Sequence, residues 1–293
     1  MIREYHGGNS YEMIRTTPTC AWKGHDFDVL NDLNDEDMIW QEEHPSHSKY
    51  VYLTGYKADH MGYEALAEVI VSRLLAHSNA ADLVTYDPVL LHYDDKDVAG
   101  CISRDFMRKG EMLIPFERLH RAYEGRGLAQ ALAAFDPPKD RIVYTVDFIE
   151  RVTNLTDVGK YLTAILELDC LTLNEDRHTN DLAVLRDEET KEFRLCPIFD
   201  NGLSLLSDLN DYPLTDDLYT CIERVKAKPF DRDHAEQMAA AEELYGSQLT
   251  FHITRDELKN EFERSSELYD PEVLQRAEYV LLEQKRKYSW LFE

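Results

Sequence analysis

Basic residues are scarce in this sequence, which has 32 Lys and Arg against 57 Asp and Glu among its 293 residues. The resulting formal charge of −25 argues against a nucleic-acid partner, because a phosphate backbone is bound by a basic surface. It also argues against binding to an anionic membrane surface. We attribute the charge mainly to solubility, although an acidic surface could also attract a basic partner.

Cysteines and long apolar runs are also lacking. The five cysteines are far apart and none are spaced as Cys-x-x-Cys, so neither a zinc knuckle nor a disulfide framework is indicated. The first residues do not form the apolar stretch of a signal peptide. No run reaches the length of a membrane span, since the one around Leu162 is interrupted by Glu167 and Asp169. We therefore expect a soluble, cytoplasmic protein with reduced and mostly buried thiols.

The sequence is rich enough in apolar residues to fold around a substantial core, with 43% hydrophobic residues and 17 tyrosines. A helix is predicted over His60–His77, because apolar residues such as Leu66 and Ile70 recur at a spacing that places them on one face of a helix. Short runs of aromatic and β-branched residues predict strands around it. These strands are Met13–Thr17, Met38–Gln41, Lys49–Thr54, Val89–His92 and Val98–Phe106.

The rest of the chain has mainly helical spacing. Helices are predicted at Leu128–Phe135, Lys139–Val152, Asp157–Leu171, Leu214–Lys226, Asp233–Tyr245, Arg255–Glu263 and Pro271–Tyr288. A hairpin is predicted for Leu182–Leu185 and Phe193–Ile198, around the charged turn "RDEETKE". The composition changes near Arg104–Gly110, so we expect an α+β fold with a small β-rich lobe (1–108) and a larger helical lobe (109–293). A ligand site is expected between the two lobes.

The stretch "LNEDRHTNDLAVL" (173–185) places many ionisable groups in a turn between two apolar elements. The second strand of the predicted hairpin runs into "PIFDNG" (197–202), and pairing of the hairpin should bring Asp200 near Asp176 and Asp181. Three converging carboxylates repel one another unless a cation is present, and such oxygen ligands favour Mg²⁺ shared with phosphates. A carboxylate not used by the metal could orient or deprotonate a hydroxyl, as phosphoryl transfer requires. The alternative is that Asp176 bonds only the local backbone and that Asp200 belongs to an ordinary turn.

The segments "NEDRHTND" and "IFDNG" resemble the catalytic and metal-binding loops of the HipA-like serine/threonine kinases, whose pattern is Asp-x-His-x-x-Asn, a hairpin and a metal-binding Asp. The resemblance implies a bilobal protein-kinase-like fold and transfer of phosphate from ATP, with Mg²⁺, to a protein Ser or Thr. It assigns Asp176 as the catalytic base and His178 as the supporting histidine of the loop. Asp181 and Asp200 take the positions of the two metal ligands.

Other segments resemble the same family in the same order, over about residues 49–206. The helix "GYEALAEVIVSRLLAH" resembles the small-lobe helix whose glutamate pairs with the nucleotide-contacting lysine; Glu68 is our choice for that role, with Glu64 in reserve. The strand "VAGCISRDFM" resembles the hinge that contacts adenine, which assigns Ser103 to the nucleotide. Gly7 and Gly8 would cover the phosphates, unless they simply form a turn.

Two positions depart from the family pattern. Leu53 stands about where the strand lysine is expected, and Lys57, just beyond the predicted strand, is preferred to Lys49 as its substitute. Asp181 replaces the family's Asn, and Asn180 could serve as the ligand after a shift of one residue. These departures leave open a weakly active or inactive kinase-fold protein that binds a nucleotide or a partner. A small-molecule hydroxyl also remains open as the substrate.

Overall fold

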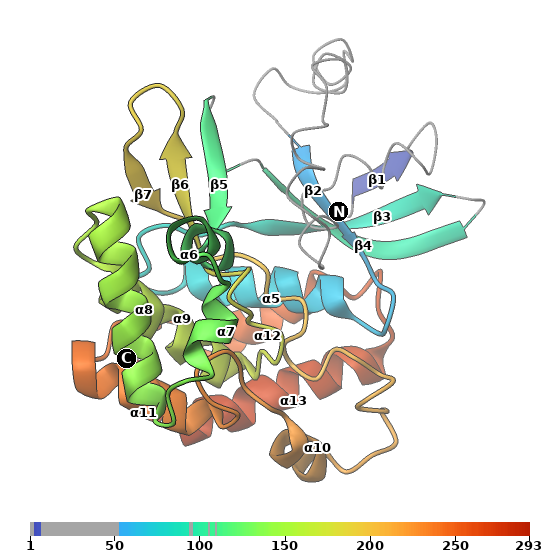
Figure 1. The fold of residues 1–293 in the computed structure, drawn as a ribbon. Coiled ribbons are helices and arrows are strands. Elements are labelled where there is room, and N and C mark those ends of the chain that lie inside the picture. The colour runs from blue at the N-terminus through green and yellow to red at the C-terminus, as the bar shows by residue number, and fades with distance from the viewer. Residues whose placement is uncertain (1–2, 7–52, 94–95, 105, 109) are drawn as a thin grey trace.

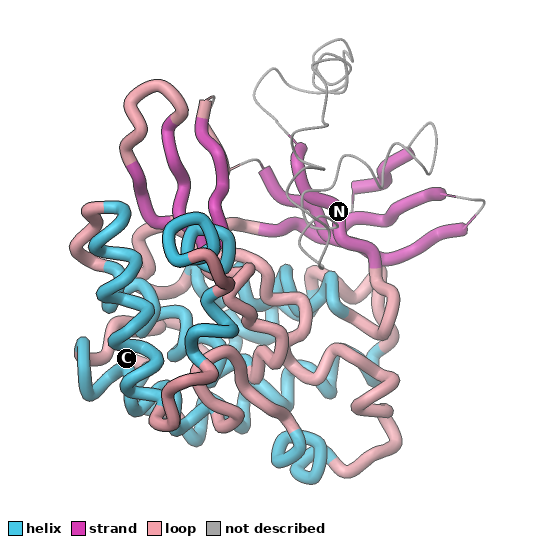
Figure 2. Tube along the Cα trace, in the orientation of Figure 1, coloured by secondary structure: helices cyan, strands magenta, loops and turns pink. Residues whose placement is uncertain are grey.

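The computed structural model describes residues 3–6, 53–93, 96–104, 106–108 and 110–293, and Figures 1 and 2 draw its elements. The strands predicted at Met13–Thr17 and Met38–Gln41 lie outside these residues, as do Lys49 and the glycines at 7 and 8. Two sheets lie above a group of helices in the view of Figure 1. The part of the chain that is described is therefore a mixed α and β structure in which helices predominate.

The first sheet has the strand order β1-β3-β4-β2. Its strands are β1 (Arg3–His6), β2 (Leu53–Ala58), β3 (Tyr86–Tyr93) and β4 (Lys96–Arg104). β1 runs parallel to β3, whereas β4 is antiparallel to both β3 and β2. The predicted strands at Val89–His92 and Val98–Phe106 are thus confirmed with shifted ends, and together they form one hairpin.

β2 differs from its prediction in a way that matters for the site. The sequence predicts a strand over 49–54 with Lys57 beyond its end, but β2 extends to Ala58 and the Cα of Lys57 pairs with that of Cys101 in β4. The pairing register shifts between Leu53 and Gly55, as in a β-bulge. The prediction failed because Gly55 is a weak strand former, and pairing with a neighbouring strand overrides such local preferences.

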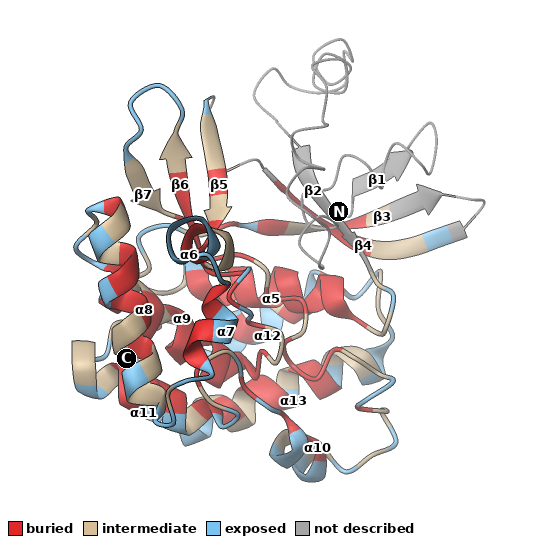
Figure 3. Cartoon of the chain, in the orientation of Figure 1, coloured by how far each residue is buried: buried red, intermediate tan, exposed pale blue. Residues whose placement is uncertain are grey.

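Helix α5 (Glu64–Ala76) confirms the helix predicted over 60–77 and packs against the first sheet, beneath it in Figure 1. Its start is fixed by two carboxylates. Glu64 accepts hydrogen bonds from the backbone N–H groups of Met61 and Gly62 at 2.9 and 3.0 Å, and Asp59 accepts from the N–H of Ala65 at 2.8 Å. Almost every residue of α5 is buried (Figure 3), as expected for a helix enclosed on both sides.

The second sheet confirms the predicted hairpin and adds a strand to it. β6 (Ala183–Asp187) and β7 (Phe193–Leu195) form the hairpin, and β5 (Glu111–Pro115) pairs antiparallel with β6. The sequence analysis did not predict β5, whose five residues include a proline. The connector between β4 and β5 covers residues 105–110, where the composition of the sequence changes.

The remaining helices form the body below both sheets. They are α6 (Phe116–Glu124), α7 (Leu128–Leu132), α8 (Pro138–Thr153), α9 (Val158–Thr172), α10 (Leu218–Arg224), α11 (His234–Tyr245), α12 (Arg255–Glu263) and α13 (Pro271–Lys287), followed by a short 3-10 helix, Ser289–Leu291. All but α6 were predicted. α10 is shorter than its prediction over 214–226, because Asp217 caps it by accepting the N–H of Thr220 at 2.9 Å. Within the described residues, none of the helices is long and apolar enough to span a membrane.

α9 is the centre of this body and positions the site. It packs against α8, α11 and α13, and nearly all of its side chains are buried, including the acids Glu167 and Asp169. It ends at Thr172, and Leu173 then takes the left-handed conformation (φ 57°) that turns the chain into the polar stretch. The apolar helix therefore delivers the polar stretch directly to the region beside α5 and the second sheet.

Candidate active site

The loop of residues 174–181, which follows α9, is organised by a buried asparagine. The side-chain oxygen of Asn174 accepts the N–H of Asp176 at 3.1 Å. Its amide nitrogen donates to Asp169 at 3.1 Å and to the carbonyl of Asp200 at 3.4 Å. One side chain thus joins the 174–181 loop to α9 and to the 199–202 segment. This role of Asn174 was not predicted from the sequence.

Arg177 is the main link between the same two segments, and its side chain is only 1% exposed. Its Nε and Nη2 donate to the two oxygens of the buried Asp169 at 3.0 and 2.9 Å, which makes a bidentate ion pair. It also donates to the carbonyl of Phe199 and to the side-chain oxygen of Asn201, both at 2.7 Å. Because these contacts use the buried guanidinium, Arg177 fixes the geometry of the loop and is not placed to meet a ligand.

His178 lies between two carboxylates of the loop. Its Nδ1 is 3.2 Å from Asp181 Oδ2, and its Nε2 is 3.2 Å from Asp176 Oδ1. Its backbone N–H also donates to Asp181 Oδ2, at 2.6 Å. The hydrogen bond to Asp181 raises the pKa of His178; burial opposes this shift, and the negative charge of Asp176 adds to it. The positive charge of Lys228 opposes the rise in this pKa. His178 thus links Asp176 and Asp181 by contacting both carboxylates.

Asp181 and Asp200 are the pair best suited to a divalent cation. Burial is the largest influence that raises the pKa of Asp181, and the negative charge of Asp200 raises it further. Asp200 adopts a left-handed backbone (φ 60°), an uncommon conformation that clusters at functional sites. A cation would relieve the repulsion between the two, and Mg²⁺ is commonly bound by one or two carboxylates together with phosphates and water. The donor set therefore fits Mg²⁺.

The expected convergence of three carboxylates is corrected in one respect. In the part of the chain that the structure describes, no three His, Cys, Asp or Glu side chains gather closely enough to hold a metal. Asp176 instead faces His178 and the ammonium of Lys228, which is 3.3 Å from its Oδ1. The reason is that the His178 ring stands between Asp176 and Asp181. The side chain of Asn180, the alternative ligand, is exposed.

Glu68 joins α5 to the 199–202 segment. Its carboxylate is fully buried and accepts the backbone N–H of Asn201 at 2.9 Å. Glu64, the reserve candidate, bonds the loop before α5 instead. The structure therefore brings Glu68, and not Glu64, to the segment that carries Asp200.

A small apolar cluster lies between the two sheets and next to Asp200. Phe199 is buried in it and stacks on Phe106 of the 105–110 connector, with ring centroids 5.7 Å apart. Ser103, the predicted hinge residue, is buried near the end of β4, opposite Tyr86 of β3. The other members are Ala65, Val69, Val84, Cys101, Leu113, Ala183, Leu185 and Cys196, with Met107 packed against them. Phe199 directly precedes Asp200, so this cluster adjoins one residue of the candidate metal pair.

The 105–110 connector is anchored by Arg194 of β7, another residue that the sequence analysis did not assign. Arg194 donates to both carboxylate oxygens of Glu111 at 2.7 and 2.8 Å and to the carbonyl of Phe106 at 3.1 Å. The hydrogen bond from Arg194 is the main reason that the pKa of Glu111 is lowered. The pair fixes the connector against the second sheet.

Lys228 is the candidate site residue that could least have been predicted from the sequence. It lies 52 residues from Asp176, in the loop between α10 and α11, and no local motif marks it. Asp169 could have been found, because an acid within an otherwise apolar helix is costly unless it is paired. In the sequence, its charge is otherwise visible only as an interruption of that apolar run.

Comparison with known proteins bears on the fold. No protein-family model and no curated protein sequence matches the chain. Among solved structures, the crystal structure of the Helicobacter pylori proinflammatory kinase CtkA is similar, with a TM-score of 0.56 and 16% sequence identity. The similarity covers 79% of this chain and 86% of that one. At this level of identity the likeness concerns the fold alone, and it shows that the chain has a kinase-like fold.

Proposed function

We propose that this protein is a HipA-like phosphotransferase that uses ATP and Mg²⁺ to phosphorylate a Ser or Thr hydroxyl of a protein. One observation supports the proposal: on a kinase-like fold, Arg177 and Asn174 tie the 174–181 loop, which carries Asp176 and Asp181, to the 199–202 segment, which carries Asp200. Residues 1–108 and 109–293 would be the two lobes of a cytoplasmic enzyme, joined by the 105–110 connector.

Asp176 is the proposed base. Its side chain is 34% exposed, so a hydroxyl can reach it, and His178 Nε2 and Lys228 Nζ lie 3.2 and 3.3 Å from its Oδ1. Asp181 and Asp200 are the proposed ligands of Mg²⁺, which when bound neutralises charge on the phosphates. His178 is the proposed positioning residue, because it contacts both Asp176 and Asp181.

The nucleotide is proposed to lie between the two sheets. Ser103 and the connector at Phe106 would border the adenine, next to the apolar cluster around Phe199. Lys57 is the proposed phosphate-contacting lysine, because its place in β2 is opposite Cys101, a member of that cluster. Glu68 would be its partner on α5. Gly7 and Gly8 stay in the proposal as the phosphate cover, although they lie outside the described residues.

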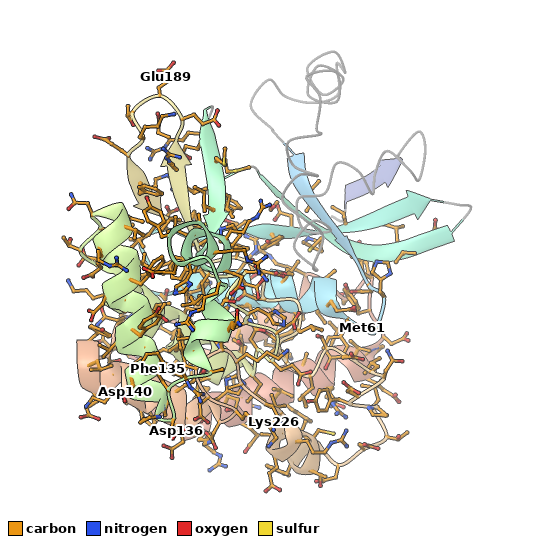
Figure 4. All side chains as sticks on the ribbon, in the orientation of Figure 1. Met61, Phe135, Asp136, Asp140, Glu189 and Lys226 are labelled. Atoms are coloured by element: carbon orange, nitrogen blue, oxygen red, sulfur yellow. The ribbon has the colours of Figure 1, made fainter. Side chains whose placement is uncertain are left out.

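Transfer of ³²P from labelled ATP to the protein itself or to a generic protein substrate tests the proposal. We expect Mg²⁺-dependent incorporation that is lost in Asp176→Ala and in Asp200→Ala. Asp136→Ala is the matched control, because Asp136, labelled in Figure 4, is an exposed residue of the segment between α7 and α8. Absence of transfer by the native chain, or equal transfer by all three variants, would refute the proposal.

The second candidate is a kinase-fold binding protein that holds a nucleotide without turnover. Two departures in the sequence favour it: Leu53 about where a lysine is expected, and Asp181 in place of Asn. A ligand that binds only the folded state raises the melting temperature, and saturation at 100 times Kd contributes about 2.7 kcal/mol. A thermal shift with ATP and Mg²⁺ but no ³²P transfer would favour this candidate. Transfer to a small-molecule hydroxyl would instead change the substrate class.

A further inference from the structure

Lys228 places a positive charge at the proposed base from a distant part of the chain. Its Nζ is 3.3 Å from Asp176 Oδ1 and 3.4 Å from His178 Nε2. We propose that Lys228 is a further catalytic residue, whose ammonium contacts the γ-phosphate of ATP beside Asp176. This inference rests on the proposed function, because it assumes that Asp176 faces the phosphoryl group that is transferred.

The loop that carries Lys228 is fixed by buried contacts. Gln237 of α11 is fully buried, donates to the carbonyl of Lys228 at 3.2 Å and accepts the N–H of Phe230 at 3.4 Å. Phe230 is itself fully buried, and its carbonyl accepts from Arg141 of α8 at 2.8 Å. The backbone at Lys228 is therefore held on α8 and α11, whereas its side chain remains 45% exposed. A held backbone with an exposed ammonium suits a ligand contact better than a structural ion pair.

The charges around the site explain why such a cation is useful. Asp176 is not among the proposed Mg²⁺ ligands, so its charge would repel a triphosphate, and like charges at close range act strongly where water is partly excluded. Arg177 does not offset this for a ligand, because it is buried and donates to Asp169, Phe199 and Asn201. An ammonium has three donors, so Lys228 can keep its contact with Asp176 and still donate to a phosphate oxygen.

The reaction places a defined demand on this ammonium. Asp176 accepts the proton of the substrate hydroxyl, and the hydroxyl oxygen forms a bond to the γ-phosphorus. The bond from that phosphorus to the bridging β–γ oxygen breaks, and its electron pair leaves with ADP. Lys228 donates hydrogen bonds throughout and gives up no proton. Fixed donors aimed at charge on a reacting group are among the largest contributions to catalysis.

The test compares Lys228→Met with Lys226→Met. Lys226 is an exposed lysine two residues away, labelled in Figure 4, so its variant loses the same charge from the same loop. Binding of ADP and of a non-hydrolysable ATP analogue, each with Mg²⁺, is measured by calorimetry, and ³²P transfer gives kcat. In Lys228→Met we expect the affinity for the analogue to fall at least about tenfold and the affinity for ADP to stay unchanged. We expect kcat to fall about 10²–10³-fold. Lys226→Met should match the parent, and Lys228→Arg should retain the preference for the analogue over ADP.

The outcomes separate this inference from the proposed function. If the parent transfers phosphate and Lys228→Met matches Lys226→Met in both assays, the role of Lys228 is refuted and the kinase function stands. If the parent does not transfer phosphate but Lys228→Met selectively loses binding of the analogue, the γ-phosphate contact stands and the kinase function fails. If the parent binds neither nucleotide, or Lys228→Met weakens ADP binding equally, the contact is refuted.

Discussion

The buried pair of Arg177 and Asp169 gives the sharpest stability prediction. Replacing Arg177 by Met leaves the Asp169 carboxylate buried without its cation, and removing one partner of a buried ion pair costs about 3–5 kcal/mol. The carbonyl of Phe199 and the side chain of Asn201 also lose a donor, and each unsatisfied group costs about 1–3 kcal/mol. Because these losses are not additive, we expect Arg177→Met to lower the free energy of unfolding by about 4–8 kcal/mol. That is a large part of the 5–15 kcal/mol roughly available to a folded domain.

Urea denaturation followed by far-UV circular dichroism measures this loss, and the chain offers a matched control. Arg151 Nη2 lies 2.8 Å from Glu124 Oε1, close to the 2.9 Å between Arg177 and Asp169, but the control side chains are 63% and 37% exposed. Exposed ion pairs contribute little, because solvent screens them. Arg151→Met should therefore unfold at nearly the parent urea concentration. The two variants separate the effect of burial from that of losing an arginine.

A double variant tests the mechanism assigned to this loss. The double variant Arg177→Met/Asp169→Leu removes both buried charges, so the folded protein should be more stable in this double variant than in Arg177→Met alone. A cost below about 1 kcal/mol for Arg177→Met, similar to that of Arg151→Met, would show that burial of the pair has been misjudged. A double variant as unstable as the sum of its single changes would show that the buried carboxylate is not the cause.

Three further predictions concern other buried groups. Burial, with a smaller contribution from Glu242, raises the pKa of Glu167 from 4.5 to about 7. Folding therefore favours protonated Glu167. The free energy of folding that this group contributes is fully present below pH 4.5 and is lost as the pH rises through 7. In urea titrations, Glu167→Gln should reduce this pH dependence by about 3 kcal/mol or less, and an unchanged pH profile would contradict the assignment. Glu68→Ala leaves the N–H of Asn201 without the carboxylate that accepts it, and it should weaken the binding of ATP with Mg²⁺ measured by calorimetry. Glu64→Ala should not weaken this binding. Equal affinities for the two variants would count against the role of Glu68. A thiol reagent should modify the four cysteines of the described residues only on unfolding, and burial raises the pKa of one of them, Cys170, to about 12. Rapid modification of any of these four in the folded protein would contradict this. These are Cys101, Cys170, Cys196 and Cys221.

Local patterns in the sequence were enough to predict most of the helices and the β6–β7 hairpin. The spacing of Leu66 and Ile70 marks α5, and the charged turn between 185 and 193 marks the hairpin. Strand ends were less predictable, because Gly55 lies inside β2 only through its pairing with β4. β5 was missed for a similar reason: its strand conformation depends on β6, about seventy residues further along the chain.

The residues of the candidate site also differ in whether local patterns in the sequence could predict them. Asp176, His178 and Asp181 form a local motif, and the hairpin explains why Asp200 was expected nearby. Lys228 belongs to no such motif, because only the packing of its loop on α8 and α11 brings it to Asp176. Contacts between distant segments carry no local signal, so they are the part of a site that spacing cannot predict.

The same contacts bear on whether Asp181, in place of Asn, argues for an inactive protein. The substitution adds one negative charge to the loop, but His178 donates to Asp181 through its backbone N–H, and its Nδ1 lies 3.2 Å from Asp181 Oδ2. Lys228 brings a cation to the neighbouring Asp176. The loop thus contains its own compensation for the added charge, and Asp181 alone is weak support for inactivity. The decisive position is the strand lysine, for which Lys57 is the proposed residue; it lies within β2, and its Cα pairs with that of Cys101, a member of the apolar cluster. Both candidate functions include nucleotide binding, so its loss in Lys57→Met would not distinguish them well. Measuring both nucleotide binding and ³²P transfer distinguishes them better.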